Sequence, residues 1–427
     1  MGRFELPRGM RDIEYEEYML IEYTRNKFME CCRLFGFNLM EPSPLEMLST
    51  LEAKSGPMIK DEIYAFKDKG GRDVALRFDL TVGLTRYIAG RRDVKLPAKL
   101  AAFSSVWRYD EPQQGRYRWF HQWDIEIYDN FSIESDADVI EFVKHYFKLL
   151  GIDVSIEVSD RALVEQFIRE KLGIDDEDKV LDMLRAVDKL SKKDENSIVQ
   201  EYASKGLDSG KLKVLLDLAK VRGSIDTLND EHLKGLDLTR LTTLLDSLKA
   251  RGIDANVNIG IVRGLDYYSS IVFEVYSSAS SLALVGGGRY DKLPIVFGRA
   301  DLGATGAAGG VERIIALLKQ KYGLKTNEVI KSYMDRGVFV AYTSKELKSN
   351  AIRTVSMLRD KGIRSECIDG SLKRQLEYAS SKGYITSIIF AEREFKDGYV
   401  IVKDMLTGKK NDLKLEEFLN KINDISL

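Results

Sequence analysis

One segment in the first third of the chain combines charged and hydrogen-bonding residues in a pattern that could hold a ligand. Residues 103–128 read FSSVWRYDEPQQGRYRWFHQWDIEIY, two alternating polar and apolar runs around a polar loop. Such alternation indicates strands with two different faces, so we predict strand, loop, strand. Gln122, Asp124 and Glu126 would then share one face, with Arg108 on the neighbouring strand.

Three acceptors and an arginine on one hairpin allow two interpretations. Buried polar groups need partners, so these residues would fill a core poorly but would suit a ligand with cationic and anionic parts. An antiparallel sheet with a solvated face and ordinary cross-strand pairs would show the same pattern. The pattern alone leaves both interpretations open.

Three segments, in a fixed order along the chain, carry a family resemblance. Residues 103–128 resemble motif 2 of a class II aminoacyl-tRNA synthetase, and GRYRWFHQ from Gly115 resembles its histidyl form. Residues 263–274, RGLDYYSSIVFE, resemble a signature of histidyl enzymes and their close relatives, and residues 303–314, GATGAAGGVERI, resemble motif 3. The chain is thus identified as a member of the histidyl-tRNA synthetase family. Its LRFDLTV segment resembles the archaeal and eukaryotic branch, because bacterial members carry glutamate in a Pro-Glu-Gly-Thr context there.

The resemblance implies a two-step reaction. Histidine attacks the α-phosphate of ATP to form histidyl-adenylate and pyrophosphate, and the acyl group then moves to tRNA(His) with release of AMP. The alternatives are a non-catalytic paralogue that acts as a regulatory histidine- or tRNA-binding subunit, and a class II synthetase for glycine, threonine or proline. Retention of Arg108, Arg263 and Arg313 favours the ligase over the first, and RGLDYY favours it over the second.

The resemblance also implies which arginines bind ATP. Arg108 and Arg263 would flank the α-phosphate as catalytic residues, Arg313 would lie against the γ-phosphate or adenine, and Arg116 would be a further ATP contact. Guanidinium groups suit this role because they fork onto two phosphate oxygens, although most arginines form surface salt bridges instead. The glycines of VGGGRYD, residues 285–291, would let a nucleotide approach the backbone, although a glycine run normally marks a turn.

A second group of residues is implied to bind the histidine substrate. The group comprises Asp79, Thr81, Gln122, Glu126, Tyr267, Tyr268 and Tyr290. Glu126 would accept from the imidazole N–H, and a site that hydrogen-bonds its substrate rejects analogues lacking the group. Adjacent strand residues point to opposite faces, so we expect only one of Tyr267 and Tyr268 to do the main recognition unless a bulge intervenes.

The loop at residues 111–118 is implied to meet the tRNA acceptor end. Gln113 and Gln114 can donate to and accept from a base edge, and Arg118 can meet a phosphate. The resemblance makes Gln113 the expected reader of the extra 5′ guanosine of histidine tRNAs.

Composition places further bounds on the protein. A net charge of −2 counts only mildly against a tRNA partner, because steering depends on local patches. Cys31, Cys32 and Cys367 form neither a disulfide framework nor a metal-ligand spacing, which fits a reducing cytoplasm. With three histidines we expect no protein metal site, and Mg²⁺ would ride on the ATP phosphates. No apolar run predicts a signal peptide or membrane span.

Pattern changes along the 427 residues predict several domains. Helical spacing dominates the middle, as at Val180, Leu184 and Val187, whereas strands and helices alternate near the C-terminus. We predict an α+β catalytic domain with a mixed, mainly antiparallel sheet flanked by helices, a helical insertion, and a C-terminal α/β anticodon-binding domain. The boundaries are 1–159 and 257–326 for the catalytic domain, 160–256 for the insertion, and 331–427 for the last domain.

The N-terminal region predicts an amphipathic helix over residues 14–35, ended by Gly36. The residues expected on its apolar face are Met19, Tyr23, Phe28, Cys31 and Leu34. With the extended segment 37–44, this helix resembles class II motif 1, which implies a homodimer interface. By periodicity alone, the helix could equally pack on its own sheet.

Overall fold

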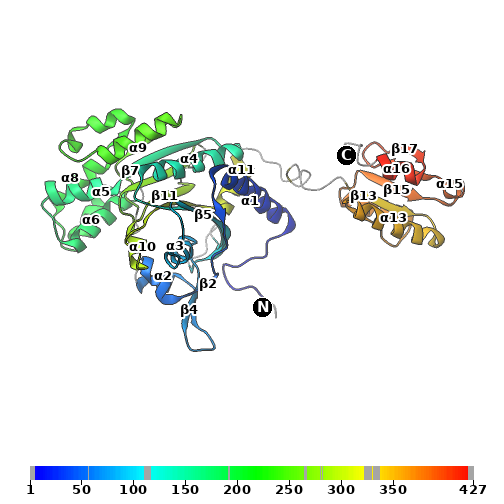
Figure 1. Cartoon of the computed structure of the whole chain (residues 1–427), viewed down its shortest axis with the longest axis horizontal. Coiled ribbons are helices and arrows are strands. Elements are labelled where there is room, and N and C mark those ends of the chain that lie inside the picture. The colour runs from blue at the N-terminus through cyan, green and yellow to red at the C-terminus, as the bar shows by residue number, and fades with distance from the viewer. Residues whose placement is uncertain are drawn as a thin grey trace. The chain divides into compact units, whose positions relative to one another are not determined.

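The computed structural model divides into two compact units, Met1–Leu324 and Lys325–Leu427 (Figure 1). It describes residues 5–55, 57–109, 117–190, 193–263, 267–278, 280, 282–321, 329 and 337–421. The predicted fold class is confirmed, since a mixed sheet flanked by helices forms the first unit and a smaller α/β sheet the second. The finer domain boundaries stay a prediction.

The first unit is built on a large sheet with nine strands in the described part of the chain. In spatial order these are β1 (Asn38–Leu39), β5 (Ala98–Trp107), β6 (Trp119–Asp129), β12 (Gly303–Gly310), β11 (Val285–Arg289), β10 (Ile271–Ser277), β7 (Val154–Asp160), β9 (Asn256–Asn258) and β8 (Arg222–Gly223). Among these described strands, only the β1–β5 and β7–β9 pairs are parallel. Strands β5 and β6 form the predicted hairpin, in register from Ala98–Tyr128 to Trp107–Trp119.

Helices pack on both faces of this sheet, so residues on both faces of β6 are buried. On one face, Trp123, Ile125 and Ile127 are fully buried beneath α1 (Tyr15–Phe35), α4 (Ile133–Leu149) and α11 (Val311–Lys321). The opposite face meets α3 (Thr81–Ala89), which packs with α2 (Leu48–Ser55) and α10 (Lys292–Val296). Next to α2 lie the turn η1 (Pro57–Glu62) and a small sheet of β2 (Leu45–Met47), β4 (Asp73–Leu76) and β3 (Ala65–Lys67).

Helix α1 ends as predicted but buries a different face. Gly36 adopts a φ of +71°, the left-handed conformation that commonly ends a helix. The buried residues of α1 are Leu20, Ile21, Thr24, Phe28, Cys31 and Cys32. Leu34 is 51% exposed, so the predicted face is wrong in part. The predicted set combined residues from two sides of the helix, whereas the buried stripe faces Trp123 and Phe142.

Helices predominate between β7 and β9 and gather at one end of the large sheet (Figure 1, upper left). They are α5 (Arg161–Gln166), the π-helical turn η2 (Phe167–Lys171), α6 (Glu177–Lys189), α7 (Glu195–Ala203), α8 (Ser209–Ala219), the 3₁₀ turns η3 (Ile225–Asn229) and η4 (Glu231–Leu233), and α9 (Thr239–Ala250). Asp176, Asp194 and Asp208 each cap a helix by accepting a backbone N–H. Arg251, just after α9, pairs with Asp138 of α4 at 2.8 Å, which ties these helices to a helix that packs on the sheet.

The second unit follows the predicted alternation of strand and helix. Its sheet runs β14 (Ser365–Glu366), β13 (Val338–Tyr342), β15 (Thr386–Phe390), β16 (Val400–Asp404) and β17 (Lys410–Leu413). The helices are η5 (Lys345–Leu347), α13 (Lys348–Asp360), α14 (Leu372–Ser381), α15 (Glu392–Lys396) and α16 (Leu415–Lys421). The sequence did not predict β17, because its KNDL segment lies mostly exposed and carries no apolar alternation.

Candidate active site

The polar face of β6 is buried. Gln122 is 5% exposed, and Asp124 and Glu126 are each 1% exposed. Thr81 Oγ1, at the start of α3, and Gln122 Nε2 each donate to Asp124 Oδ2 over 3.3 Å. The solvated-face interpretation is therefore wrong, and β6 carries an internally bonded polar floor beneath α3.

Glu126 lies where the neighbouring strand leaves room for it. Gly306 of β12 pairs with Glu126 in register, and a Cβ at residue 306 would overlap the Glu126 carboxylate. Tyr290, which directly follows β11, donates its hydroxyl to Glu126 Oε2. Burial holds the pKa of Tyr290 well above its ordinary value, and the Glu126 carboxylate raises it further. The Tyr290 hydroxyl is therefore a protonated donor that orients Glu126.

Two of the three tyrosines lie side by side, contrary to the sequence expectation. The rings of Tyr267 and Tyr268 stack with centroids 4.5 Å apart, and Tyr267 meets Tyr290 edge-on at 5.8 Å. Strand β10 begins only at Ile271, so the alternation of strand side chains does not apply to the two tyrosines. All three rings can therefore line one side of a pocket.

Asp79 lies at the entrance to α3, close to these rings. It is 7% exposed, and its Oδ1 accepts from the Val82 N–H at 3.3 Å. Its charge contributes to raising the pKa of Tyr267, after the larger effects of burial and of Tyr268. The structure thus brings together an acidic group and the tyrosine cluster, as the predicted histidine pocket requires.

Arg108 links the end of β5 to the polar floor. Its Nε donates to the carbonyl of Phe78 at 2.9 Å, and its Nη2 donates to Gln122 Oε1 at 3.2 Å. The guanidinium carbon lies 5.2 Å from the centroid of the Phe120 ring. These contacts hold a half-buried cation at the edge of the floor, next to Gln122 and the segment before Asp79.

Arg263 has an unusual backbone conformation. Its φ is +54°, in the left-handed region that residues other than glycine rarely adopt. Its Nη1 donates to Glu274 Oε1 at 2.7 Å, and its guanidinium carbon lies 5.9 Å from the Tyr268 ring centroid. Burial alone would lower the pKa of Arg263, but Tyr268 and Glu274 raise it above its ordinary value. Arg263 is therefore a permanent cation beside the tyrosine cluster.

The glycines of β11 leave room for side chains of this protein and for the backbone of β10. A Cβ at Gly286 would overlap the Arg263 guanidinium, and one at Gly287 would overlap the Phe273 ring. Gly288 lies against the backbone of β10. The close approach predicted for a nucleotide is thus made here by the side chains and backbone of this chain itself.

The remaining predicted residues are more scattered. Arg313 lies exposed in the first turn of α11, where its Nη1 donates to the Ala283 carbonyl at 2.8 Å. Arg118 is buried, and its guanidinium stacks 3.9 Å from the Tyr109 centroid and donates to the Arg8 carbonyl at 3.3 Å. That placement does not favour a phosphate contact, so the tRNA role of Arg118 stays a prediction. Gln113, Gln114 and Arg116 lie outside the described residues.

The sequence did not predict the role of Glu312, which joins the motif at residues 303–314 to the one at residues 103–128. Glu312, just before Arg313, accepts from the backbone N–H of His121 and lies 3.0 Å from its Nδ1. Arg11 approaches the same carboxylate at 3.6 Å. Glu312 thereby anchors the start of α11 to β6, and a sequence signal for it was the polar His121 at an inward position of an otherwise apolar alternation.

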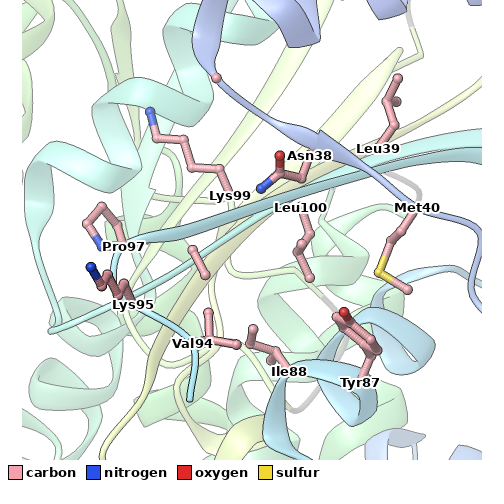
Figure 2. Close-up of a pocket in the computed structure, with 12 residues that line it drawn as sticks. Asn38, Leu39, Met40, Tyr87, Ile88, Val94, Lys95, Pro97, Lys99 and Leu100 are labelled. Carbon is pink, nitrogen blue, oxygen red and sulfur yellow. The ribbon is translucent and has the colours of Figure 1, made fainter. Parts of the chain in front are cut away.

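A surface pocket of about 440 Å³ lies elsewhere, between β1 and the end of α3 (Figure 2). Asn38, Leu39 and Met40 form one side of it, and Tyr87 and Ile88 form another. None of the predicted site residues lines this pocket. It is separate from the polar floor.

No group of three or more His, Cys, Asp or Glu side chains in the described ranges is placed to hold a metal ion. The described helices also include none that is long and apolar enough to cross a membrane.

A mixed, mainly antiparallel sheet whose β5–β6 hairpin holds a buried polar floor, with an arginine bonded to it and a second α/β unit, defines a class II aminoacyl-tRNA synthetase. The sequence model of histidyl-tRNA synthetase matches residues 9–314, and that of an anticodon binding domain matches residues 337–425. The chain belongs to the histidyl-tRNA synthetase family.

Archaeal relatives match the chain over nearly its whole length. The histidine–tRNA ligase of Pyrococcus furiosus is 32% identical and covers 97% of this chain and 98% of its own length. That of Pyrococcus abyssi is 33% identical and covers 99% of both chains. The predicted resemblance to the archaeal branch is confirmed.

Solved structures share the fold. The histidyl-tRNA synthetase of Nostoc sp. PCC 7120 has a TM-score of 0.78 at 22% identity and covers 99% of this chain and 100% of its own. An ATP phosphoribosyltransferase regulatory subunit/histidyl-tRNA synthetase from Bacillus halodurans has a TM-score of 0.71 at 23% identity, covering 92% and 99%. At these identities the likeness establishes the fold alone.

Proposed function

We propose that this chain joins L-histidine to tRNA(His) through a histidyl-adenylate, using ATP and releasing pyrophosphate and AMP. Full-length relatives that are histidine–tRNA ligases support the activity. The observation that carries the assignment of the site is the buried Glu126 carboxylate, which accepts from the Tyr290 hydroxyl. Arg108 is bonded to Gln122 of the same strand, and Arg263 lies beside the Tyr268 ring. The non-catalytic alternative is not favoured, because these arginines are retained.

Histidine binds by its imidazole and its α-ammonium in this proposal. Glu126 accepts from an imidazole N–H while Tyr290 holds the carboxylate in place, and the stacked Tyr267 and Tyr268 rings close the pocket. The ammonium group takes the acceptors at the other end of the floor, where Asp79, Thr81 and Gln122 lie. An amino acid without an imidazole donor would strand the buried Glu126, so the site would reject it.

The phosphates of ATP bind to arginine side chains in this proposal. Arg108 and Arg263 meet the α-phosphate, and their charges matter most as negative charge builds up during the displacement. Arg313 and Arg116 are further ATP contacts. Mg²⁺ carried on the phosphates would neutralise part of their charge, and phosphate oxygens are the ligands it prefers.

The tRNA would be bound by several parts of the chain. The loop with Gln113 and Gln114, together with Arg118, would meet the acceptor end, and the second unit would bind the anticodon. The helical segment 160–256 would form an insertion beside the acceptor stem. Because the substrate is tRNA, the reaction belongs in the cytoplasm.

A homodimer is proposed because apolar side chains are exposed on the edge strand β1 and on β2, which follows it in the chain. Leu39 is 50% exposed, and Leu45 and Met47 of β2 are 40% and 43% exposed. An exposed strand edge with apolar neighbours is normally covered, and a second copy would cover it. Leu39→Glu should convert the dimer to a monomer in sedimentation velocity, whereas Val214→Glu, at an exposed position on α8, should not. A wild-type monomer at micromolar concentration would contradict the dimer.

ATP–pyrophosphate exchange with each of the twenty amino acids tests the activity. We expect exchange that depends strictly on histidine and Mg²⁺. Histidine binding without exchange would refute the ligase and support a regulatory histidine-binding role instead.

A further inference from the structure

Arg161 lies outside the residues assigned to the reaction, where β7 ends and α5 begins. Its side chain is 2% exposed. Its Nη1 donates to two successive carbonyls, that of Val262 at 3.2 Å and that of Arg263 at 3.1 Å. Its own N–H donates to the Ser270 carbonyl at 3.0 Å. One buried guanidinium thus fastens the chain just before the tyrosine pair, while its backbone is held at the start of β10.

The fastened segment contains the left-handed Arg263. A positive φ is unfavourable for a residue with a side chain and persists only where surrounding contacts hold it. That backbone sends the Arg263 guanidinium over Gly286 to Glu274. A relaxed backbone would point the side chain elsewhere. The contacts of Arg161 therefore help to fix the backbone conformation of Arg263 and, through it, the direction of its side chain.

Arg161 is itself anchored to the helices that follow β7. The neighbouring Asp160 is buried, accepts from the Ala162 N–H at 2.9 Å, and pairs with Arg240 of α9 at 2.6 Å. The chain of contacts runs from α9 through Asp160 and Arg161 to Arg263.

We propose that Arg161 is a positioning residue that holds Arg263 in its left-handed conformation and so aims its guanidinium at the reacting phosphate. This rests on the proposed role of Arg263. Arg161 meets no substrate, and its effect passes entirely through the two carbonyls that it binds.

Pyrophosphate exchange with Arg161→Met in the full chain tests the proposal, because methionine keeps much of the side-chain length and removes the donors. We expect kcat to fall about 10²-fold, the effect of a small misplacement of a catalytic group, with little change in the KM for histidine. Arg161→Lys, which keeps the charge and one donor group, should restore part of kcat and guards against a misfolded first variant. Arg169→Met, which removes a more exposed arginine nearby, should leave both constants unchanged. A raised KM with an unchanged kcat would overturn the proposal.

A double-mutant cycle separates positioning from general stabilisation. In an Arg263→Ala background, Arg161→Met should cost no more than about twofold in kcat, since Arg161 would have nothing left to aim. If the two substitutions lower kcat by factors that multiply, Arg161 does not act through Arg263. That result would refute the positioning role of Arg161 and leave the role of Arg263 standing. An Arg263→Ala variant with wild-type kcat would overturn the role assigned to Arg263 and the proposal with it.

Discussion

The two ends of the candidate site are built differently. At the histidine end, Glu126 lies within strand β6 and Tyr290 directly follows β11, both almost fully buried. At the phosphate end, Arg108 follows the end of β5, and Arg263 lies between β9 and β10 in a left-handed conformation. Selection of the amino acid is thus assigned to polar atoms fixed inside the sheet. Charge is supplied by residues beyond the strands.

This difference extends to what holds each group in place. Tyr290 orients Glu126 by a direct side-chain bond. The two arginines also make side-chain bonds, to Gln122 and to Glu274. In addition they depend on backbone carbonyls, since Arg108 donates to that of Phe78 and the Arg263 carbonyl accepts from Arg161. The histidine end should therefore respond to changes in volume or hydrogen bonding within the pocket, and the phosphate end to changes in surrounding segments.

The largest effect is expected from Gly306→Ala. The added methyl group would overlap the Glu126 carboxylate, and the β6 and β12 backbones are held in register at this pair, so Glu126 must move. We expect no measurable histidine binding by calorimetry in a folded protein. Gly310→Ala, where a Cβ meets nothing within 4 Å, is the matched control and should bind histidine normally. Normal histidine binding by the Gly306→Ala variant would show that Glu126 is not part of the histidine pocket.

Arg263→His should lower kcat for pyrophosphate exchange about 10²–10³-fold, because one charge that stabilises the transition state is lost. The KM for histidine should change little, since Glu126 is oriented by Tyr290 whereas Arg263 is bonded to Glu274. An unchanged kcat with a raised KM would mean that Arg263 contributes only uniform binding.

Tyr290→Phe should raise the KM for histidine about 10- to 100-fold, because a buried hydrogen bond to a charged group contributes about 1.5–3 kcal/mol. The kcat should fall less than the KM rises, and steady-state exchange measures both. Tyr276→Phe removes a hydroxyl that donates to Glu274, on the Arg263 side, and should leave the KM for histidine unchanged. Equal KM values for the two variants would argue against the role of Tyr290.

Removal of residues 331–427 should have the smallest effect on exchange. Both ends of the site belong to the first unit, so histidine-dependent exchange should stay within a few-fold of wild type while tRNA charging falls. A folded truncation without exchange would show that the first unit does not contain the complete site.

The sequence predicted the parts of the site that follow regular periodicity. The β5–β6 hairpin and the shared face of Gln122, Asp124 and Glu126 follow from a period of two, which the structure preserves. The positions of Tyr267 and Tyr268 did not follow, because they precede β10 and strand alternation does not reach them.

Contacts between distant segments were also invisible to periodicity. Gly306 makes room for Glu126 through the register of β12 with β6, and Gly286 makes room for the side chain of Arg263, which precedes β10. Arg161 lies 102 residues before the Arg263 carbonyl that it binds. No local pattern marks such a partner, whereas a fixed strand register brings it into contact.

The separation of the two ends is tested most directly by titrating L-histidine into the Arg263→His variant by calorimetry, without ATP. If selection lies entirely with the Glu126 end, the dissociation constant should stay within about twofold of the wild-type value, as expected for independent sites. A dissociation constant raised tenfold or more would contradict the account, because the arginine end would then contribute to histidine binding itself.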